Sequence, residues 1–131
     1  MSLRFRTGHR VFVYEVAIDM RAGFDRLSML VREKMARNIL EGDLYLFLGK
    51  NRRRLKAICF DGTGLVLINK RLEKGNFMSL SDLESAEITS DELDIIISGG
   101  VIRRRKFGQE VLTAIHEPRI VNLDATPRTR D

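Results

Sequence analysis

Apolar residues follow two different spacings along the chain, and these spacings predict both strands and helices. The run VFVYEVAI at 11–18 is β-branched and apolar, which predicts a strand. Beyond Asp19, apolar residues recur at steps of three and four, as on the buried face of an amphipathic helix. This stripe consists of Met20, Phe24, Leu27, Val31 and Met35. Asp19 is the expected N-cap of the helix, and Gly42 is expected to close the connection after it.

Three further runs predict strands that are covered on both faces. DLYLFL at 43–48, LKAICF at 55–60 and LVLINK at 65–70 are largely apolar at successive positions, which is typical of strands inside a sheet. DGTG at 61–64 predicts a hairpin turn, because glycine tolerates positive φ and the Asp61 side chain can accept from the turn's own amides. NFMSL at 76–80 is a candidate fourth strand.

The segment EITSDELDIIISGG predicts a second helix. Thr89 and Glu92 have the spacing of a capping box, and Gly99 is a suitable C-terminal stop. Residues 101–107 (VIRRRKF) form a candidate strand, with 115–118 as its exit. Residues 118–131 contain both prolines and lack apolar periodicity, so we expect a mobile tail.

These elements predict a single α+β domain over residues 1–117. Its expected core is an antiparallel β-meander sheet packed with two main helices. A mixed sheet and a partly closed barrel are also compatible with the pattern.

Composition narrows the class of protein and of partner. The chain has 131 residues, 44% of them apolar and 31% charged, which is typical of one globular domain. A net charge of +5 favours phosphate-bearing partners, nucleic acid before an anionic membrane. No apolar run approaches the roughly 20 residues of a membrane span, and residues 1–10 lack a signal-peptide pattern. The single cysteine, Cys59, lies in an apolar run and is expected to be a packed thiol in a reducing, cytoplasmic setting.

Positive charge is concentrated between positions 49 and 75. This stretch holds eight of the 23 Lys and Arg residues and only two acids. In a meander, the GKNRRR loop and the later KRLEK segment return to the same edge of the sheet. The predicted nucleic-acid-binding residues are Lys50, Arg52, Arg53, Arg54, Lys70, Arg71 and Lys74. Lys56 and the run at 103–106 are weaker candidates. The alternative is that these charges only keep the ends of the strands soluble.

Other kinds of site receive less support from the sequence. The aromatic residues of the strands are expected in the core rather than in a base-stacking surface: Tyr45, Phe47, Phe60 and Phe77. Asp19 and Asp61 could pair in a metal-dependent nuclease, but a helix cap and a turn explain them better. His9 and His116 are isolated, so we predict no catalytic residue, metal site or cofactor.

Three ordered stretches carry a family resemblance: DMRAGFDRL at 19–27, GDLYLFLGKNRRRLKAICFDGTGLVLINKRLEKGNF at 42–77 and ITSDELDIIISGG at 88–100. Together they resemble the accessory protein encoded by the second reading frame of insertion-sequence-66 (IS66) transposons, over about residues 11–100. The resemblance implies a bacterial mobile-element protein that assists transposition, while a separate, larger protein carries the catalytic acids. It therefore implies no enzymatic activity and supplies no site residues.

Two functions follow from combining the resemblance with the charge pattern. The first is binding of transposon-end DNA through the basic edge. The alternative is a protein-interaction module that docks on the transposase or another accessory protein, or that forms a homodimer, through its doubly apolar strands.

Overall fold

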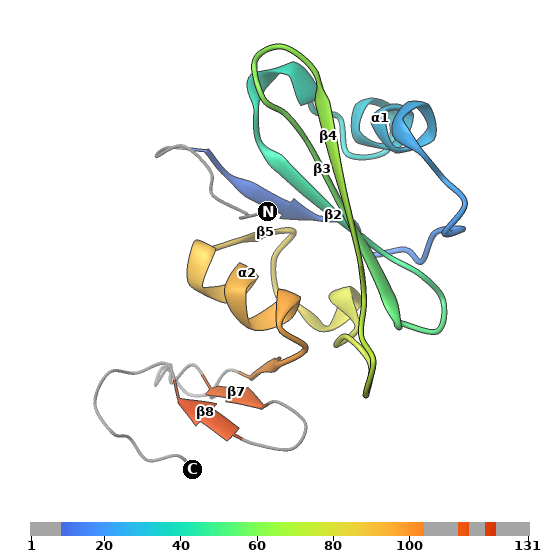
Figure 1. Cartoon of the computed structure of the whole chain (residues 1–131). Helices are drawn as coiled ribbons and strands as arrows, with labels where there is room; N and C mark the ends of the chain where they lie inside the picture. The colour runs from blue at the N-terminus through green and yellow to red at the C-terminus, as the bar shows by residue number, and fades with distance from the viewer. Residues whose placement is uncertain (1–8, 104–112, 116–119, 123–131) are drawn as a thin grey trace.

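The structure is a computed structural model that describes residues 9–103, 113–115 and 120–122 (Figure 1). Its centre is a five-stranded sheet in the order β4-β3-β2-β1-β5. These strands are β1 (Val11–Val13), β2 (Leu44–Leu48), β3 (Arg54–Phe60), β4 (Leu65–Arg71) and β5 (Glu87–Ile88). The helices are α1 (Phe24–Glu33) and α2 (Ser90–Ile97), with 3-10 turns at Ile39–Glu41 and Leu80–Asp82. A second sheet contains β6 (Val101–Arg103), β7 (Thr113–Ile115) and β8 (Ile120–Asn122), all antiparallel.

The five-stranded sheet is mixed, which corrects the expectation of an antiparallel sheet. β2, β3 and β4 pair antiparallel in sequence order, and β5 pairs antiparallel with β1. β1, however, runs parallel to β2. The reason is α1, which lies between these two strands in sequence and carries the chain back along the sheet, so that β2 starts at the same end as β1.

The strand predicted at 11–18 is much shorter in the structure. β1 ends at Val13, although the amides of Tyr14 and Ile18 still donate to the carbonyls of Leu46 (2.9 Å) and Leu48 (3.0 Å). Between these two bonds, residues 15–17 leave the sheet and are exposed. The apolar pattern therefore predicted the strand but not the place where its pairing is interrupted.

The N-terminus of α1 also differs from the prediction. The N-cap is Gly23, and the helix makes no side-chain cap. Asp19 instead forms a turn before the helix, in which its carbonyl accepts from the Ala22 amide and its carboxylate accepts from the Arg21 amide. Asp19 as an N-cap was therefore wrong, because the helix begins four residues later than the apolar stripe suggests.

The predicted features of α2 are confirmed. The Thr89 hydroxyl accepts from the Glu92 amide at 3.1 Å, and the Glu92 carboxylate accepts from the Thr89 amide at 2.9 Å, which forms a capping box. Gly99 follows the helix with φ of +91°, and its amide donates to the Ile96 carbonyl. This left-handed conformation at a helix end favours glycine.

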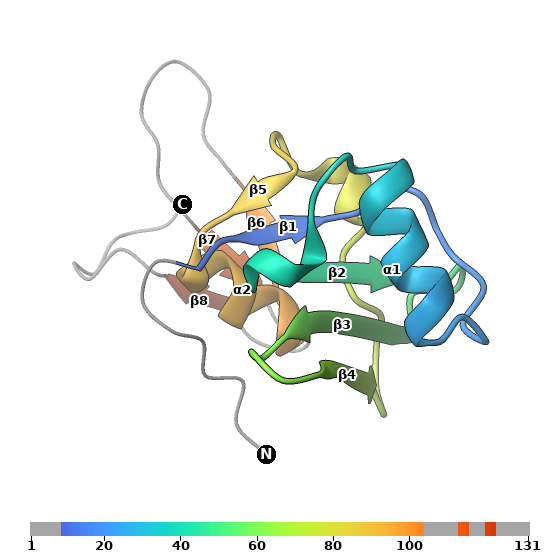
Figure 2. The same ribbon diagram turned by 90° about the horizontal axis from the view of Figure 1, so that it is seen from above.

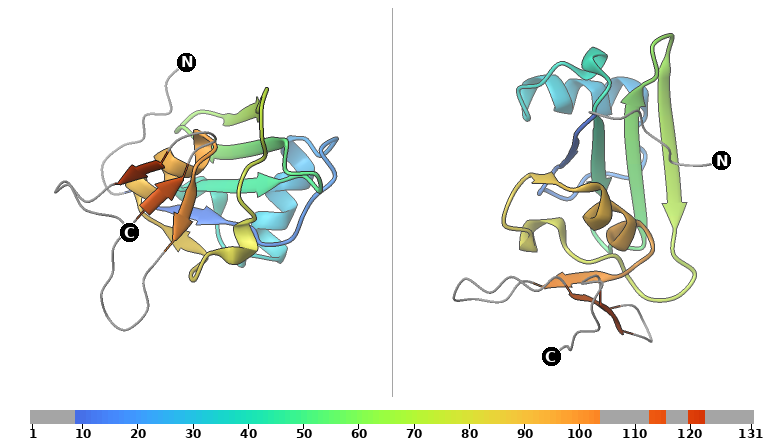
Figure 3. Two further views of the ribbon diagram at one scale, coloured as in Figure 1. Left: turned by 90° about the horizontal axis from the view of Figure 1, so that it is seen from below. Right: turned by 90° about the vertical axis from the view of Figure 1, so that its left-hand side faces the viewer.

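The core has two halves, one on each face of the sheet. Leu44, Leu46 and Leu48 pack on the α2 side, whereas Tyr45 and Phe47 pack on the α1 side. Figures 2 and 3 show the two helices on opposite faces of the sheet. β2 and β3 are buried on both faces as predicted, but β4 is a half-buried edge strand.

The remaining predictions concern one turn, two candidate strands and the C-terminal tail. The DGTG turn is confirmed: the Asp61 carboxylate accepts from the amides of Thr63 and Gly64, each at 2.9 Å. The candidate strand at 76–80 is not a strand, although Phe77 and Met78 are buried. Of the candidate strand at 101–107, β6 is described, and residues 104–107 lie outside the described residues. The predicted tail at 118–131 also lies outside them, apart from β8.

None of the helices in the described ranges is long and apolar enough to cross a membrane.

Candidate nucleic-acid interface

The turn between β2 and β3 is a compact structure that presents side chains at the end of the sheet. The Arg52 amide donates to the Gly49 carbonyl at 3.1 Å, and the Gly49 amide donates to the Arg54 carbonyl at 3.2 Å. Arg52 has φ of +58°, an uncommon conformation for a residue with a side chain. A Cβ at Gly49 would lie 2.8 Å from Cγ of Met20, so a larger residue there would displace that side chain. The chain therefore turns tightly here, with consecutive basic residues on its outside.

The segment after β4 is fastened to this turn by backbone hydrogen bonds. The Leu72 amide donates to the Arg53 carbonyl at 2.9 Å, and the Phe77 amide donates to the Arg52 carbonyl at 2.7 Å. The Asn76 side chain adds a third bond, from Nδ2 to the Asn51 carbonyl at 2.7 Å. The structure thus brings the GKNRRR loop and the KRLEK segment together at one end of the sheet. We call the seven predicted cations at this end the basic rim: Lys50, Arg52, Arg53, Arg54, Lys70, Arg71 and Lys74.

Two arginines of the basic rim use part of their guanidinium groups to support it. Arg52 donates from Nη1 to the Phe77 carbonyl at 3.3 Å, and Arg53 donates from Nη2 to the Leu72 carbonyl at 3.2 Å. Both residues remain exposed, so their other donors face solvent. The sequence offered no signal for this supporting role, nor for that of Asn76, because the bonds join segments about two dozen residues apart.

Lysine side chains on β3 and β4 are bound within the fold. Lys70 is half-buried, and its Nζ donates to the Ile97 carbonyl at the C-terminus of α2, at 2.7 Å. A cation is favourable there because it faces the negative end of the helix dipole. Lys56 is buried, and its Nζ donates to the Ala22 carbonyl ahead of α1, at 2.6 Å. These two ammonium groups hold the helices to the sheet from opposite faces.

The remaining cations of the basic rim face solvent. Lys50, Arg54 and Lys74 are exposed, and their side chains form no hydrogen bond or ion pair with another described residue. Arg54 lies directly opposite Arg71 in the β3–β4 register, where like charges repel. Arg71 is compensated by Glu73, 3.1 Å away, in a solvent-exposed pair. The arrangement leaves an excess of positive charge where two strand ends meet.

The described part of the basic rim has no surface for stacking bases. Tyr45, Phe47 and Phe77 are fully buried, which confirms their prediction as core residues, whereas Phe60 is half-buried. Cys59 is likewise a packed thiol, and burial raises the pKa of that thiol, which favours its protonated form. In the second basic run, Arg103 is exposed at the end of β6, and residues 104–106 lie outside the described residues.

The two aspartates considered for catalysis both have structural partners. The guanidinium of Arg21 holds Asp19 at 2.6 Å and keeps the pKa of that carboxyl far below its usual range. Backbone amides of Thr63 and Gly64 lower the pKa of Asp61 in its turn. Within the described ranges, no group of three or more His, Cys, Asp or Glu residues is placed to hold a metal ion.

Comparison with known proteins agrees with the resemblance seen in the sequence. A family model described as IS66 Orf2-like protein matches residues 9–107. Two proteins of Sinorhizobium fredii (strain NBRC 101917 / NGR234) are similar to this chain. Uncharacterized protein y4hO is 37% identical over 91 residues, which are 69% of this chain and 79% of y4hO. Uncharacterized protein y4jC is 30% identical over 93 residues, 70% of this chain and 80% of y4jC. No solved structure matches the chain.

Because the family model matches most of its length, the chain belongs to the family of IS66 Orf2-like accessory proteins, which indicates an accessory role in transposition.

Proposed function

We propose that this accessory protein binds transposon-end DNA by holding its phosphate backbone on the basic rim. The observation that carries the proposal is the group of exposed cations without partners among the described residues, Lys50, Arg54 and Lys74. Phosphate oxygens would relieve the repulsion between Arg54 and Arg71, and arginine can hold a phosphate with two parallel hydrogen bonds.

The type of contact follows from what surrounds these cations. The nearby aromatic residue Phe77 is fully buried, so binding would not depend on stacking with unpaired bases. The rim is built from strand ends and turns rather than from a helix that could enter the major groove, so we expect backbone contacts to dominate. Duplex DNA held by charge, with strong dependence on salt, is the expected ligand. Lys70 contributes less than the others, because its ammonium already binds the Ile97 carbonyl.

Fluorescence anisotropy of a labelled transposon-end duplex across a salt series tests the proposal, with a scrambled duplex for comparison. Each phosphate contact contributes about 0.9 to the slope of log affinity against log salt concentration. The variant Lys50→Gln/Arg54→Gln/Lys74→Gln should therefore lower that slope by almost three. The control removes three exposed cations of α1 and its C-terminal end, outside the rim: Arg26→Gln/Arg32→Gln/Lys34→Gln.

The comparison between the two triple variants decides the assignment. The control should keep nearly the slope of the parent protein, although its net charge equals that of the rim variant. A rim variant that retains the parent slope would contradict the proposal, and so would an equal loss in both variants. Tighter binding of the transposon-end duplex than of the scrambled duplex would add recognition beyond charge.

A further inference from the structure

A second surface lies beside α1, where strand-forming sequence does not pair with the sheet. Residues 15–17 are exposed, and 61% of the Val16 surface is accessible. Their backbone groups make no hydrogen bond with another described residue, whereas the Tyr14 and Ile18 amides on either side bind β2. A β-branched residue exposed at an unpaired bend departs from the local pattern of the chain, and such departures are expected at functional sites.

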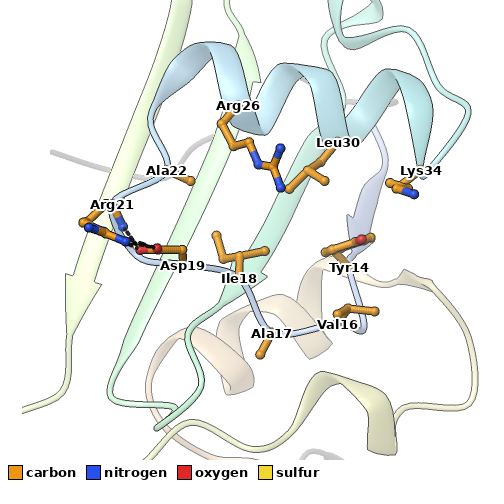
Figure 4. Close-up of a pocket in the computed structure, with 10 residues that line it drawn as sticks. All are labelled: Tyr14, Val16, Ala17, Ile18, Asp19, Arg21, Ala22, Arg26, Leu30 and Lys34. Atoms are coloured by element: carbon orange, nitrogen blue, oxygen red, sulfur yellow. Dashed lines mark hydrogen bonds and ion pairs between the residues drawn. The ribbon is translucent and has the colours of Figure 1, made fainter.

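This stretch forms one wall of a groove below α1. Two adjoining hollows, of about 650 and 540 Å³, are both lined by Tyr14, Val16 and Lys34. Figure 4 shows Arg26, Leu30 and Lys34 projecting from α1 toward the chain that carries Tyr14 and Ile18. We call this feature the α1 groove. Its apolar lining includes Tyr14, Val16 and Leu30, and the cations Arg26 and Lys34 lie on the side of α1 and its C-cap.

The charges of the α1 groove are not balanced within it. The side chains of Arg26 and Lys34 are exposed and make no hydrogen bond or ion pair with another described residue. Of the two acids of the groove, Asp19 is already paired with Arg21, and Glu15 alone does not offset both cations. Positions 26 and 34 are about 12 Å apart along the helix axis at a rise of 1.5 Å per residue. Two carboxylates four residues apart in an extended peptide span about 13 Å.

We propose that the α1 groove binds an extended peptide segment of a partner protein, with apolar side chains between two carboxylates four residues apart. The apolar side chains would cover Tyr14 and Val16, and the carboxylates would pair with Arg26 and Lys34. The peptide backbone would bond to the unbonded backbone groups of residues 15–17. Nucleic acid fits less well, because apolar side chains line the groove and the acids Glu15 and Asp19 lie on the groove walls.

This function goes beyond DNA binding and uses a different surface. The two surfaces are nevertheless adjacent. The Ile18 amide binds the Leu48 carbonyl at the start of the turn that carries the basic rim, and Gly49 packs against Met20. A peptide in the α1 groove and DNA on the basic rim would therefore be held side by side.

The test uses a fluorescein-labelled peptide, Ser-Asp-Val-Leu-Val-Asp-Ser, and the full chain at low salt without DNA. Anisotropy should show binding, and replacing both aspartates of the peptide by asparagine should weaken it. The variant Arg26→Glu/Lys34→Glu should lose roughly tenfold in affinity, the upper part of the range for two exposed ion pairs. Arg32→Glu, which reverses one charge, is the control, because Arg32 is exposed on the same helix and lines neither hollow.

Two further measurements test whether the peptide binds in the α1 groove: a peptide of reversed charge, and hydrogen exchange of the groove's backbone amides. A peptide with lysine in place of both aspartates should bind Arg26→Glu/Lys34→Glu better than it binds the parent protein. Amide exchange of residues 15–17 should slow when the aspartate peptide is added. The proposal is overturned if the aspartate peptide does not bind, if Arg32→Glu weakens it as much as the double variant does, or if duplex DNA rather than peptide protects these amides.

Discussion

The two ends of the β3–β4 hairpin are closed by different means. At the acidic end, the Asp61 carboxylate closes a four-residue turn by accepting from the amides of Thr63 and Gly64. At the basic end, Arg54 and Arg71 face each other, and closure depends on bonds between loops that are distant in sequence. One end thus satisfies its own backbone and charge locally. The other end requires the rest of the fold to hold cations together, which is the arrangement expected of a binding surface rather than of a simple turn.

The largest change in unfolding free energy should come from replacing Phe77, which supports the basic end. Phe77 is fully buried, and its backbone binds Arg52 through both its amide and its carbonyl. Phe77→Ala should lower the free energy of unfolding by about 3–5 kcal/mol, through lost burial and the cavity that remains. Urea denaturation measures this loss. Phe24→Ala, at a largely exposed aromatic position, is the control and should cost far less.

A smaller loss of unfolding free energy should follow from Lys56→Ala. This variant tests whether a buried cation contributes more to stability than the exposed cations at the basic end. The Lys56 ammonium is a charged donor to the Ala22 carbonyl in a buried position. Its removal should cost about 2 kcal/mol of unfolding free energy, because it leaves that carbonyl without its charged partner. Lys50→Ala should cost less than about 0.5 kcal/mol as an exposed site. Equal unfolding curves for the two variants would show that Lys56 does not hold α1 to the sheet.

Lys70 and Lys74 offer a closer pair, because they stand near each other in one segment and differ in their partners. Lys70→Ala should cost about 1 kcal/mol, from the hydrogen bond to Ile97 and the interaction with the end of α2. Lys74→Ala should leave stability nearly unchanged and reduce the salt slope of DNA binding by about one. Thermal denaturation should show the larger loss of stability for Lys70→Ala, and anisotropy should show the larger loss of salt slope for Lys74→Ala. If one variant shows the larger loss in both measurements, the distinction between supporting and binding cations is wrong.

The smallest effect is expected at the acidic end, from Asp61→Ala. Its amide partners lower the pKa of Asp61 in the folded protein. A lowered folded pKa stabilises the protein above the unfolded pKa, and this contribution is lost as pH falls through the folded pKa. The melting temperature of Asp61→Ala should therefore lie slightly below that of the parent protein at pH 7, and the gap should narrow in acid. A gap that is constant with pH would show that the carboxylate charge does not stabilise the turn.

The sequence predicted the features that depend on neighbouring residues. The DGTG turn, the Thr89–Glu92 capping box and the Gly99 stop each involve side chains and amides within a few positions. The buried strands β2 and β3 were also evident, because apolar residues occupy both of their faces. These features are set by local backbone preferences and by burial, which one sequence can reveal.

Features that depend on distant partners could not be predicted in the same way. The parallel pairing of β1 with β2 follows from where α1 places the chain, and Lys70 was assigned to the surface because nothing near it indicates α2. The basic rim was placed at one end of the sheet from the order of the strands. Which of its cations remain free depends on bonds from Phe77, Leu72 and Ile97 that charge counting does not show.

The pairing of β5 with β1 has a consequence for how the protein is made. β1 lies near residue 11, but its second neighbour in the sheet, β5, lies near residue 88. During synthesis from the N-terminus, the β2–β4 strands can pair early through short connections, while one edge of β1 waits for most of the chain to follow. Contacts between distant positions form slowly, so the last stage of folding should be the docking of β5 and α2 onto a partly formed sheet. Until then, the nascent chain would expose the leucine-rich face of the sheet that α2 covers, and this is the interval in which it would depend most on chaperones.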